Sequence, residues 1–306
     1  MKHDAPAHPP IDVAVVQFKP AKGDIAANVV TLQSIFAQLA QPRPPRIIVL
    51  PEACLTGYFL EGAVYELALT VGALSQTLHT AWVAAAGPGV SVDVVCGFFE
   101  NDGGTLYNSA VYATVGGSGG PLVAHVHRKM FLPTYGVFDE ERFLSRGRHL
   151  GVFASALGTA ALLICEDAWH AIMPTVAALK GARVLFIPSA SPGRGLSGKG
   201  ELESVLRWKA LLRAHASEHG VYIIYAGLTG FEGGKGMAGS TCIVAPSGNF
   251  VVEAPALEAC IVRATLDPAE VEVARATLPL LGDLAAVLPD LWYDSEIPLP
   301  RYAAHV

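Results

Sequence analysis

Apolar runs rich in β-branched residues recur along the chain, and the spacing between them restricts the folds it can adopt. The runs IDVAVVQF at 11–18 and RIIVLPE at 46–52 are separated by a helical pattern over about 25–41, which predicts a strand-helix-strand unit. TAALLICED at 159–167 and RVLFIPSA at 183–190, each followed by a helix, predict two more such units, the last helix covering 201–219. We therefore expect parallel strands joined by helices in both halves of the chain.

Other strands follow one another too closely for helical crossovers. After a predicted helix over 62–86, the runs VDVVCGFFE, LYNSAVYATV and PLVAHVHRK are joined by the Gly-rich turns NDGG at 101–104 and GGSGG at 116–120, which favours antiparallel pairing. VYIIYAGL, STCIVAPSG, NFVVEAP and ACIVRATLD predict further strands before a proline-containing tail from about 270. So many strands exceed one modest open sheet. We expect a two-sheet α/β sandwich forming one domain over 11–306, after a disordered lead at 1–10.

The apolar content of this chain is high. Hydrophobic residues make up 52% of it, charged residues 16%, and the mean hydropathy is +0.40, which excludes general disorder. Many strands should be buried on both faces, or a second subunit should cover the remaining apolar surface. The longest uncharged stretch, 67–92, has Ser, Gln, Thr and His residues in its middle. It therefore predicts a core or interface helix and no membrane span.

Charge and cysteine content narrow the choice of partners and compartment. The formal net charge is −6, and the basic residues are scattered, so we expect no nucleic-acid partner. The chain has five cysteines, Cys54, Cys96, Cys165, Cys242 and Cys260, an odd number without close pairs. Four of the five lie in apolar surroundings typical of reduced core thiols. The N-terminus lacks the apolar segment of a signal peptide. A cytoplasmic location is expected.

Cys165 is the first candidate catalytic residue. It ends the nearly uncharged strand AALLIC and is followed at once by Glu166 and Asp167. A strand-to-helix turn is where α/β folds present nucleophiles, because the next backbone N–H groups point toward a developing oxyanion. A core cysteine that fills space is the alternative, but the acidic pair directly after it favours a turn at the protein surface or at a site.

Two charged residues also stand at strand ends. Glu52 closes RIIVLP, where burial would raise the pKa of its carboxyl toward that of a useful general base; a surface or helix-capping acid is the other interpretation. Lys129 closes PLVAHVHRK and could stabilise negative charge on a thiolate or a tetrahedral intermediate. An ordinary solvated charge is the alternative for Lys129.

Other chemistries are less well supported. His170 follows Cys165 by five positions, but that offset places it on the next helix and not facing the thiol. His125 and His127 alternate on a strand without partners at metal-ligand spacing, so no metal site is expected. GGKG at 233–236 lacks the spacing of a phosphate-binding loop. We expect no cofactor.

Three ordered motifs resemble a known family. PEACLTGY, HRKMFLPTYGVFDEERFL and LLICEDAW resemble the Glu, Lys and Cys signatures of the nitrilase superfamily, in order and spacing, down to about Pro255. The phrases LPTYGVFDE and ICEDAW are most similar to the glutaminase domain of glutamine-dependent NAD synthetases. The resemblance implies a four-layer α-β-β-α sandwich that forms a homodimer through its outer helices, or a higher homo-oligomer.

The resemblance also assigns roles. It implies that Cys165 attacks the amide carbon, that Glu52 acts as the base, and that Lys129 with the backbone N–H of Glu166 stabilises the oxyanion. A second glutamate of the family falls on Glu140, or on Glu141 if the alignment shifts by one. The substrate pocket is expected to include Tyr58, Tyr135 and Glu166.

The departures from the family limit the expected activity. No ATP-using synthetase domain follows the matched region, so NAD synthesis by this chain alone is not expected. The sequence Cys165-Glu166-Asp167 favours amides over nitriles. We expect an amidohydrolase that releases ammonia and a carboxylic acid from a small amide through a thioester. The alternatives are a glutaminase subunit that supplies ammonia to a partner synthetase, and a silent scaffold of the same fold.

Overall fold

The computed structural model describes residues 9–293 and contains two six-stranded sheets. The first sheet has the order β14-β1-β2-β3-β4-β5. Its strands are β1 (Ile11–Gln17), β2 (Ile47–Val49), β3 (Val92–Asp102), β4 (Thr105–Val115), β5 (Leu122–Arg128) and β14 (Cys260–Leu266). The pairs β1·β2 and β2·β3 are parallel, and the outer pairs are antiparallel. The sheet is mixed, as the short turns predict.

The second sheet repeats this plan with the order β13-β12-β9-β8-β7-β6. Its strands are β6 (Phe153–Ser155), β7 (Gly158–Leu162), β8 (Val184–Ser189), β9 (Tyr222–Gly227), β12 (Cys242–Val244) and β13 (Phe250–Glu253). Here β7·β8 and β8·β9 are parallel, while the outer pairs are antiparallel. The predicted strand-helix units therefore lie at the centre of each sheet.

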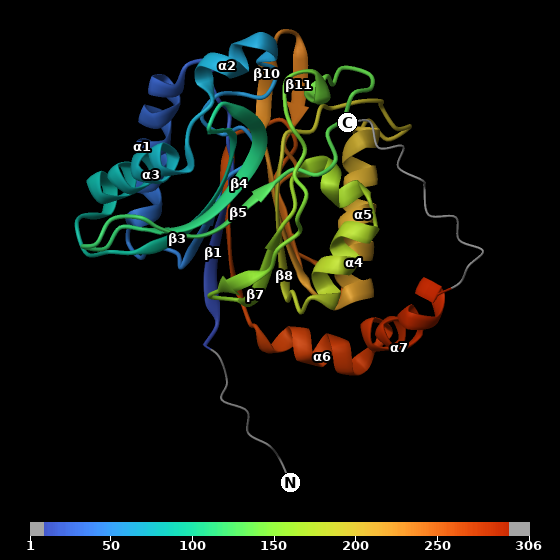
Figure 1. Cartoon of the computed structure of the whole chain (residues 1–306). Helices are drawn as coiled ribbons and strands as arrows, with labels where there is room; N and C mark the ends of the chain where they lie inside the picture. Colours follow the sequence, from blue (N-terminus) through green and yellow to red (C-terminus); the bar gives the residue numbers. More distant parts are fainter. Residues whose placement is uncertain (1–8, 294–306) are drawn as a thin grey trace.

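Helices cover the outer face of each sheet. Helices α1 (Ile25–Ala40) and α3 (Val71–Ala86) lie on one side, and α4 (Ile172–Leu179) and α5 (Glu203–His219) lie on the other, with both sheets between them (Figure 1). This arrangement confirms the expected four-layer α-β-β-α sandwich.

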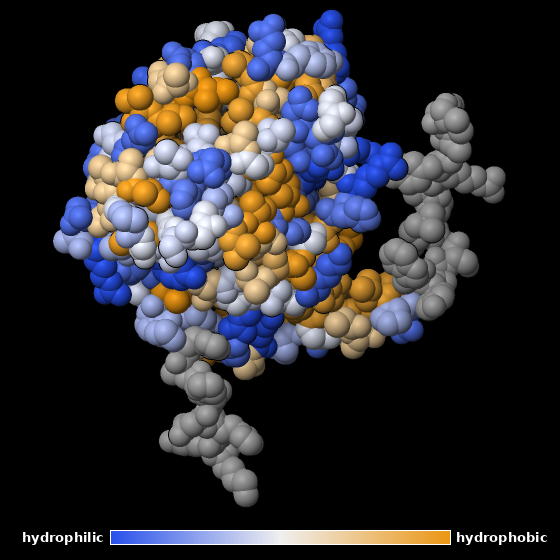
Figure 2. Space-filling view, turned by 60° about the vertical axis from the view of Figure 1, so that its left-hand side comes forward, coloured by the Kyte–Doolittle hydropathy of each residue, from blue (hydrophilic) through white to orange (hydrophobic). Residues whose placement is uncertain are grey.

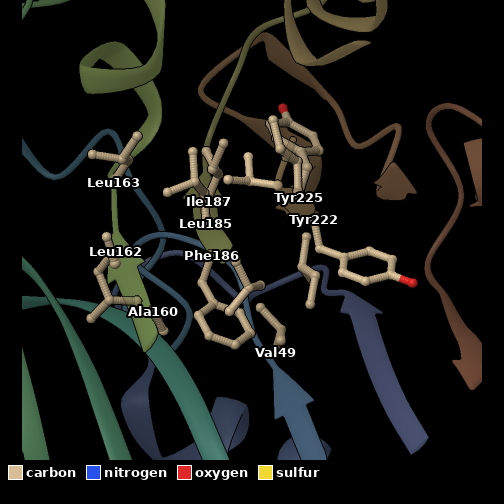
Figure 3. Close-up of a cluster of buried hydrophobic side chains, with 14 of the residues drawn as sticks. Val49, Ala160, Leu162, Leu163, Leu185, Phe186, Ile187, Tyr222 and Tyr225 are labelled. Atoms are coloured by element: carbon tan, nitrogen blue, oxygen red, sulfur yellow. The ribbon is translucent and has the colours of Figure 1, made fainter. Parts of the chain in front are cut away.

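Strand alternation explains the two main cores. Val13 and Val15 of β1 belong to the large core that joins the two sheets, whereas Ala14 and Val16 pack with the residues of α1 and α3. Successive side chains of a strand point to opposite faces, so one apolar run serves both layers. Figure 3 shows part of the core between the sheets, where Phe186 of β8 lies near Val49 of β2.

The helix predicted over 62–86 is interrupted. It divides into a 3₁₀ turn (η1, Glu61–Ala63), α2 (Val64–Leu67) and α3. Between α2 and α3 the backbone of Leu69 pairs with β3, through its N–H to Phe99 O at 2.9 Å and its carbonyl to Asn101 N at 2.9 Å. The side chain of Thr70 then caps α3 by accepting from Ala73 N. Tertiary strand pairing overrides the helical pattern here.

The region predicted as a C-terminal tail contains two helices. Residues 269–277 form α6 (Ala269–Thr277) and residues 280–293 form α7 (Leu280–Tyr293), which contacts α4 and α5. Pro268 precedes the first turn of α6, and Val271 is buried. The expected disordered lead falls mainly on residues 1–8, which lie outside the described residues, as do residues 294–306.

An additional hairpin was not predicted. Strands β10 (Thr229–Glu232) and β11 (Lys235–Ala238) pair around the glycines of the GGKG sequence. The carboxylate of Glu232 accepts hydrogen bonds from Tyr58 N and Phe59 N, each at 2.9 Å. The hairpin therefore holds the loop that follows Glu52.

The surface carries apolar side chains as well as polar ones. On the face shown in Figure 2 the apolar side chains form several patches. Val287 and Leu291 of α7 are 49% and 47% exposed. Within residues 9–293, every helix is too short or too polar to traverse a lipid bilayer.

Candidate active site

Glu52 and Lys129 meet at one end of the first sheet. Lys129 directly follows β5, and Glu52 lies in the turn after β2. The ammonium Nζ of Lys129 donates to Glu52 Oε1 at 2.9 Å, and the two side chains are 0% exposed. The two residues are 77 positions apart in the chain. Their contact arises because both strands end at the same edge of the sheet.

Glu140 is the second carboxylate at this ammonium. It begins a 3₁₀ turn (η2, Glu140–Arg142) and accepts from Lys129 Nζ at 2.6 Å through Oε1. The neighbouring Glu141 is exposed and faces Thr134. The structure therefore places Glu140, and not Glu141, at the lysine.

Burial and charge act against each other in this cluster. Burial alone would lower the pKa of Lys129, but the carboxylates of Glu140 and Glu52 outweigh burial and hold that pKa above its ordinary value. For Glu140, burial is the largest effect, and with the repulsion of Glu52 it raises the pKa to about 7 despite the attraction of Lys129. Lys129 is thus a stable cation between two carboxyl groups that compete for it.

Every oxygen of Glu52 has a donor. Asn108 Nδ2 donates to Oε1 at 2.7 Å, and the backbone N–H of Ala190 donates to Oε2 at 2.6 Å across the two sheets. Gly97 of β3 allows the backbone of Glu52 to lie close to this strand, because a Cβ at position 97 would lie 2.5 Å from the Cα of Glu52. Asn108 and Ala190 were not among the predicted site residues. A polar residue inside the apolar strand LYNSAVYATV was the available signal for Asn108.

Cys165 opens a 3₁₀ turn (η3, Cys165–Trp169) after β7, with a left-handed backbone φ of 43°. A non-glycine residue in this conformation is strained and is common at functional sites. Its side chain is 8% exposed, and Sγ accepts from the hydroxyl of Ser189 at 3.2 Å.

The thiol is neutral at rest. Burial and then the charge of Glu52 raise the pKa of Cys165 well above its ordinary value, and Lys129 only partly offsets them. The attraction expected from the lysine therefore exists but does not dominate. A neutral thiol needs a base to become a nucleophile.

Asp167 connects the turn at Cys165 to the segment that follows Lys129. Its carboxylate accepts from Ile164 N, Met130 N and Phe131 N at 3.0 Å each, and from His127 Nε2 at 2.9 Å. Burial alone would raise the pKa of Asp167, but the hydrogen bond from His127 leads the effects that hold it below its ordinary value. From the sequence, Asp167 was recognised only as an acidic neighbour of Cys165.

A cavity of about 280 Å³ opens beside Cys165. Tyr135 and Glu166, both expected to contact substrate, line it, and the hydroxyl of Tyr135 donates to the Glu166 carboxylate at 2.9 Å. Tyr58 does not line this cavity. It is buried, and its hydroxyl donates to Glu140 Oε1.

Charged residues missed by the sequence analysis also line the cavity. Arg194 lies over the ring of Phe138, with 5.0 Å from Cζ to the ring centroid. Arg207 is paired with Glu203 at 3.3 Å. The entrance therefore presents both signs of charge to a ligand.

The histidines have other partners. His170 stacks on Phe131, with ring centroids 3.6 Å apart, and lies 3.8 Å from Glu166. His125 stacks on Phe153. These contacts place neither ring against the thiol.

One group of possible metal ligands occurs among the described residues: His215, Glu218 and His219 on α5. His215 Nε2 lies 3.0 Å from the Ala168 carbonyl, and His219 Nε2 lies 3.3 Å from the Thr175 hydroxyl. Each ring thus has a protein partner at Nε2, while the buried Nδ1 atoms lack one in the described part of the chain.

Comparisons with known proteins agree with this geometry. Residues 12–276 match the carbon-nitrogen hydrolase family. The glutamine-dependent NAD(+) synthetase of Rhodobacter capsulatus is 28% identical over 258 residues, which cover 83% of this chain and 43% of that enzyme. The chain thus spans less than half the length of this relative. The 2-oxoglutaramate amidase of Bacillus subtilis is 30% identical over 240 residues, covering 78% of this chain and 84% of that enzyme.

Solved structures show the same fold. Nit3 of Saccharomyces cerevisiae, a member of branch 10 of the nitrilase superfamily, aligns with a TM-score of 0.73 and 25% identity. The alignment covers 90% of this chain and 96% of Nit3. With the family match over residues 12–276 and the shared sandwich, this chain belongs to the carbon-nitrogen hydrolases of the nitrilase superfamily.

Proposed function

We propose that this protein hydrolyses a small carboxamide through a thioester on Cys165, with Glu52 as the base and Lys129 as the oxyanion-stabilising cation. One observation carries the proposal: a buried ammonium lies between two carboxylates, and its charge acts on the thiol of Cys165, which lines a cavity. Burying such charges is costly unless they are paired or used.

In the first half-reaction, Glu52 removes the thiol proton while Sγ forms a bond to the amide carbon. Lys129 and the backbone N–H of Glu166 stabilise the negative charge that develops on the carbonyl oxygen. The C–N bond then breaks, the proton held by Glu52 passes to the nitrogen, and ammonia leaves. The raised pKa of Cys165 supports this order, because the thiol cannot ionise without a base.

In the second half-reaction, Glu52 removes a proton from water, whose oxygen attacks the thioester carbon. The C–S bond breaks, the thiolate regains a proton, and a carboxylic acid leaves. Glu140 would keep Lys129 in place throughout, since its carboxylate contacts the ammonium directly. The balance is amide plus water giving acid plus ammonia, without a metal or cofactor, so turnover should persist in EDTA.

The relatives suggest which amides to try. A 2-oxoglutaramate amidase and glutamine-dependent NAD(+) synthetases both carry the aligned region, so glutamine and other short primary amides are the proposed substrate class. A glutaminase subunit that passes ammonia to a separate synthetase is the second candidate. It is supported by the alignment to 43% of the synthetase from Rhodobacter capsulatus.

The test is a panel of primary amides and nitriles with ammonia release as the readout. We expect turnover of at least one amide, no turnover by Cys165→Ala, and nearly full activity in Cys242→Ala, whose thiol is also buried. Loss of activity in folded Cys242→Ala with retention in Cys165→Ala would contradict the proposal. Failure of the wild type on every amide would favour the silent scaffold.

We further propose a homodimer formed through the outer helices. Ile172 of α4 is 60% exposed and Leu206 of α5 is 36% exposed, and a second copy would bury such side chains. Sedimentation equilibrium should give twice the mass of the chain. A reducing cytoplasm is the proposed compartment, because all five cysteines are free.

A further inference from the structure

We propose that Ser189 is a catalytic residue that donates a hydrogen bond to the sulfur of Cys165, and that Tyr225 positions it. The proposal deepens the function proposed above and rests on Cys165 being the nucleophile. It gives a role to the hydroxyl groups of Ser189 and Tyr225, which take part in no step described above.

The three groups form a buried line. Ser189 Oγ lies 3.2 Å from Cys165 Sγ, and Tyr225 Oη lies 3.1 Å from Ser189 Oγ. Ser189 is 0% exposed and Tyr225 is 1% exposed. Ser189 ends β8 and Tyr225 lies on the adjacent parallel strand β9. Rigid strands therefore fix both hydroxyls.

The chemistry sets the direction of the hydrogen bonds. A thiolate can only accept, so Ser189 must donate its single proton to sulfur when negative charge develops there. The serine oxygen can then accept from Tyr225. With Ser189 as its acceptor, Tyr225 keeps the serine hydroxyl from turning away from the sulfur.

The charges nearby make a neutral donor valuable. Glu52 opposes ionisation of the thiol, and the charge of Lys129 is shared with the carboxylates of Glu52 and Glu140. A hydrogen-bond donor without net charge can stabilise the thiolate without changing the pairing of Lys129 with the two carboxylates. Sulfur carries developing charge twice, as the attacking nucleophile and as the group released from the thioester, so Ser189 would act in both half-reactions.

The experiment measures iodoacetamide alkylation of Cys165 against pH, read from the mass of the peptide that contains it. Ser189→Ala should shift the profile upward by about one pH unit and slow the reaction about tenfold at fixed pH, a change equal to about 1.4 kcal/mol. Tyr225→Phe should slow it about threefold. Ser189→Ala/Tyr225→Phe should match Ser189→Ala alone, because the tyrosine acts through the serine.

Tyr222→Phe is the matched control. Tyr222 lies on the same strand, and its hydroxyl donates to the Asp267 carbonyl at 3.1 Å. Figure 3 shows the rings of Tyr222 and Tyr225 pointing in different directions from β9. This variant should leave the alkylation profile unchanged. Thermal melting of each variant identifies any that fails to fold. In Ser189→Ala the Tyr225 hydroxyl loses its acceptor, and the double variant removes that hydroxyl as well.

Superimposable profiles for folded wild type and Ser189→Ala would overturn the proposal. Additive effects of the two substitutions would overturn the role of Tyr225. Alkylation needs no amide turnover, so the result stands even if the proposed amidase activity fails. On an amide that is turned over, Ser189→Ala should lower kcat about tenfold with KM unchanged, which a loss of substrate contact would not produce.

Discussion

Replacing Asp167 by asparagine keeps the size of the side chain but removes one acceptor and the negative charge. The carboxylate accepts four hydrogen bonds, three of them from backbone N–H groups on two different segments. In Asp167→Asn the amide NH₂ would face the N–H of Ile164 and the ring of His127. Each of these two buried donors, left without an acceptor, costs about 1–3 kcal/mol.

We expect Asp167→Asn to lose about 3–5 kcal/mol of unfolding free energy. For 306 residues the unfolding entropy is about 0.6 kcal/mol per degree, so Tm should fall by about 5–8 °C in calorimetry. Because the pKa of Asp167 is lowered on folding, this stabilisation is present above its ordinary pKa and is lost as pH falls through the folded value. The difference should therefore be constant between about pH 6 and 8.

The control is Asp139→Asn, at an exposed aspartate that lies 3.5 Å from Arg142. Its Tm should change by less than about 1 °C, as for most exposed ion pairs. If Asp167→Asn shifted Tm no more than Asp139→Asn, the four hydrogen bonds would not be stabilising the contact between the turn at Cys165 and the segment after Lys129.

Further expectations follow from the carboxylates, a close glycine contact and the thiol. Glu140→Gln should lower kcat about a hundredfold or more, whereas Glu141→Gln should stay near wild type; equal losses would contradict the placement of Glu140 at Lys129. Gly97→Ala should destabilise the protein by about 1–3 kcal/mol in urea unfolding, because its Cβ would press on the Glu52 backbone; an unchanged midpoint would refute that. Since the pKa of Cys165 is raised, its alkylation should still accelerate above pH 9, and a plateau near pH 7 would contradict a neutral resting thiol.

Sequence reasoning found the strand ends but not the contacts that cross between them. Glu52, Lys129 and Cys165 could be named because each follows an apolar run within a recognisable motif. Ser189 and Ala190 could not, since their contacts depend on β8 lying beside β7, which precedes Cys165, and facing Glu52 of the first sheet. Such long-range hydrogen bonds leave no periodic signal in the sequence.

One local prediction failed, and other local features were not predicted. The helix over 62–86 is broken because Leu69 pairs with β3, and only the fold supplies that partner. The tail from about 270 is helical, and a signal was present: Pro268 followed by Ala269 and Glu270 is typical of a helix start. The contact between the Tyr58 hydroxyl and Glu140 was not predicted either, because an aromatic ring next to glycine does not reveal it.

The central claim is that Glu52, Lys129 and Cys165 act as one site, and the alkylation profile of Cys165 in Lys129→Met tests it most directly. Lys129 lowers the pKa of the thiol although burial and Glu52 raise it. Removing the ammonium should therefore shift the profile to higher pH and slow alkylation at pH 8, while Lys199→Met, at an exposed lysine, should leave it unchanged. Superimposable profiles for wild type and Lys129→Met would mean that the lysine does not act on the thiol, and would contradict the account.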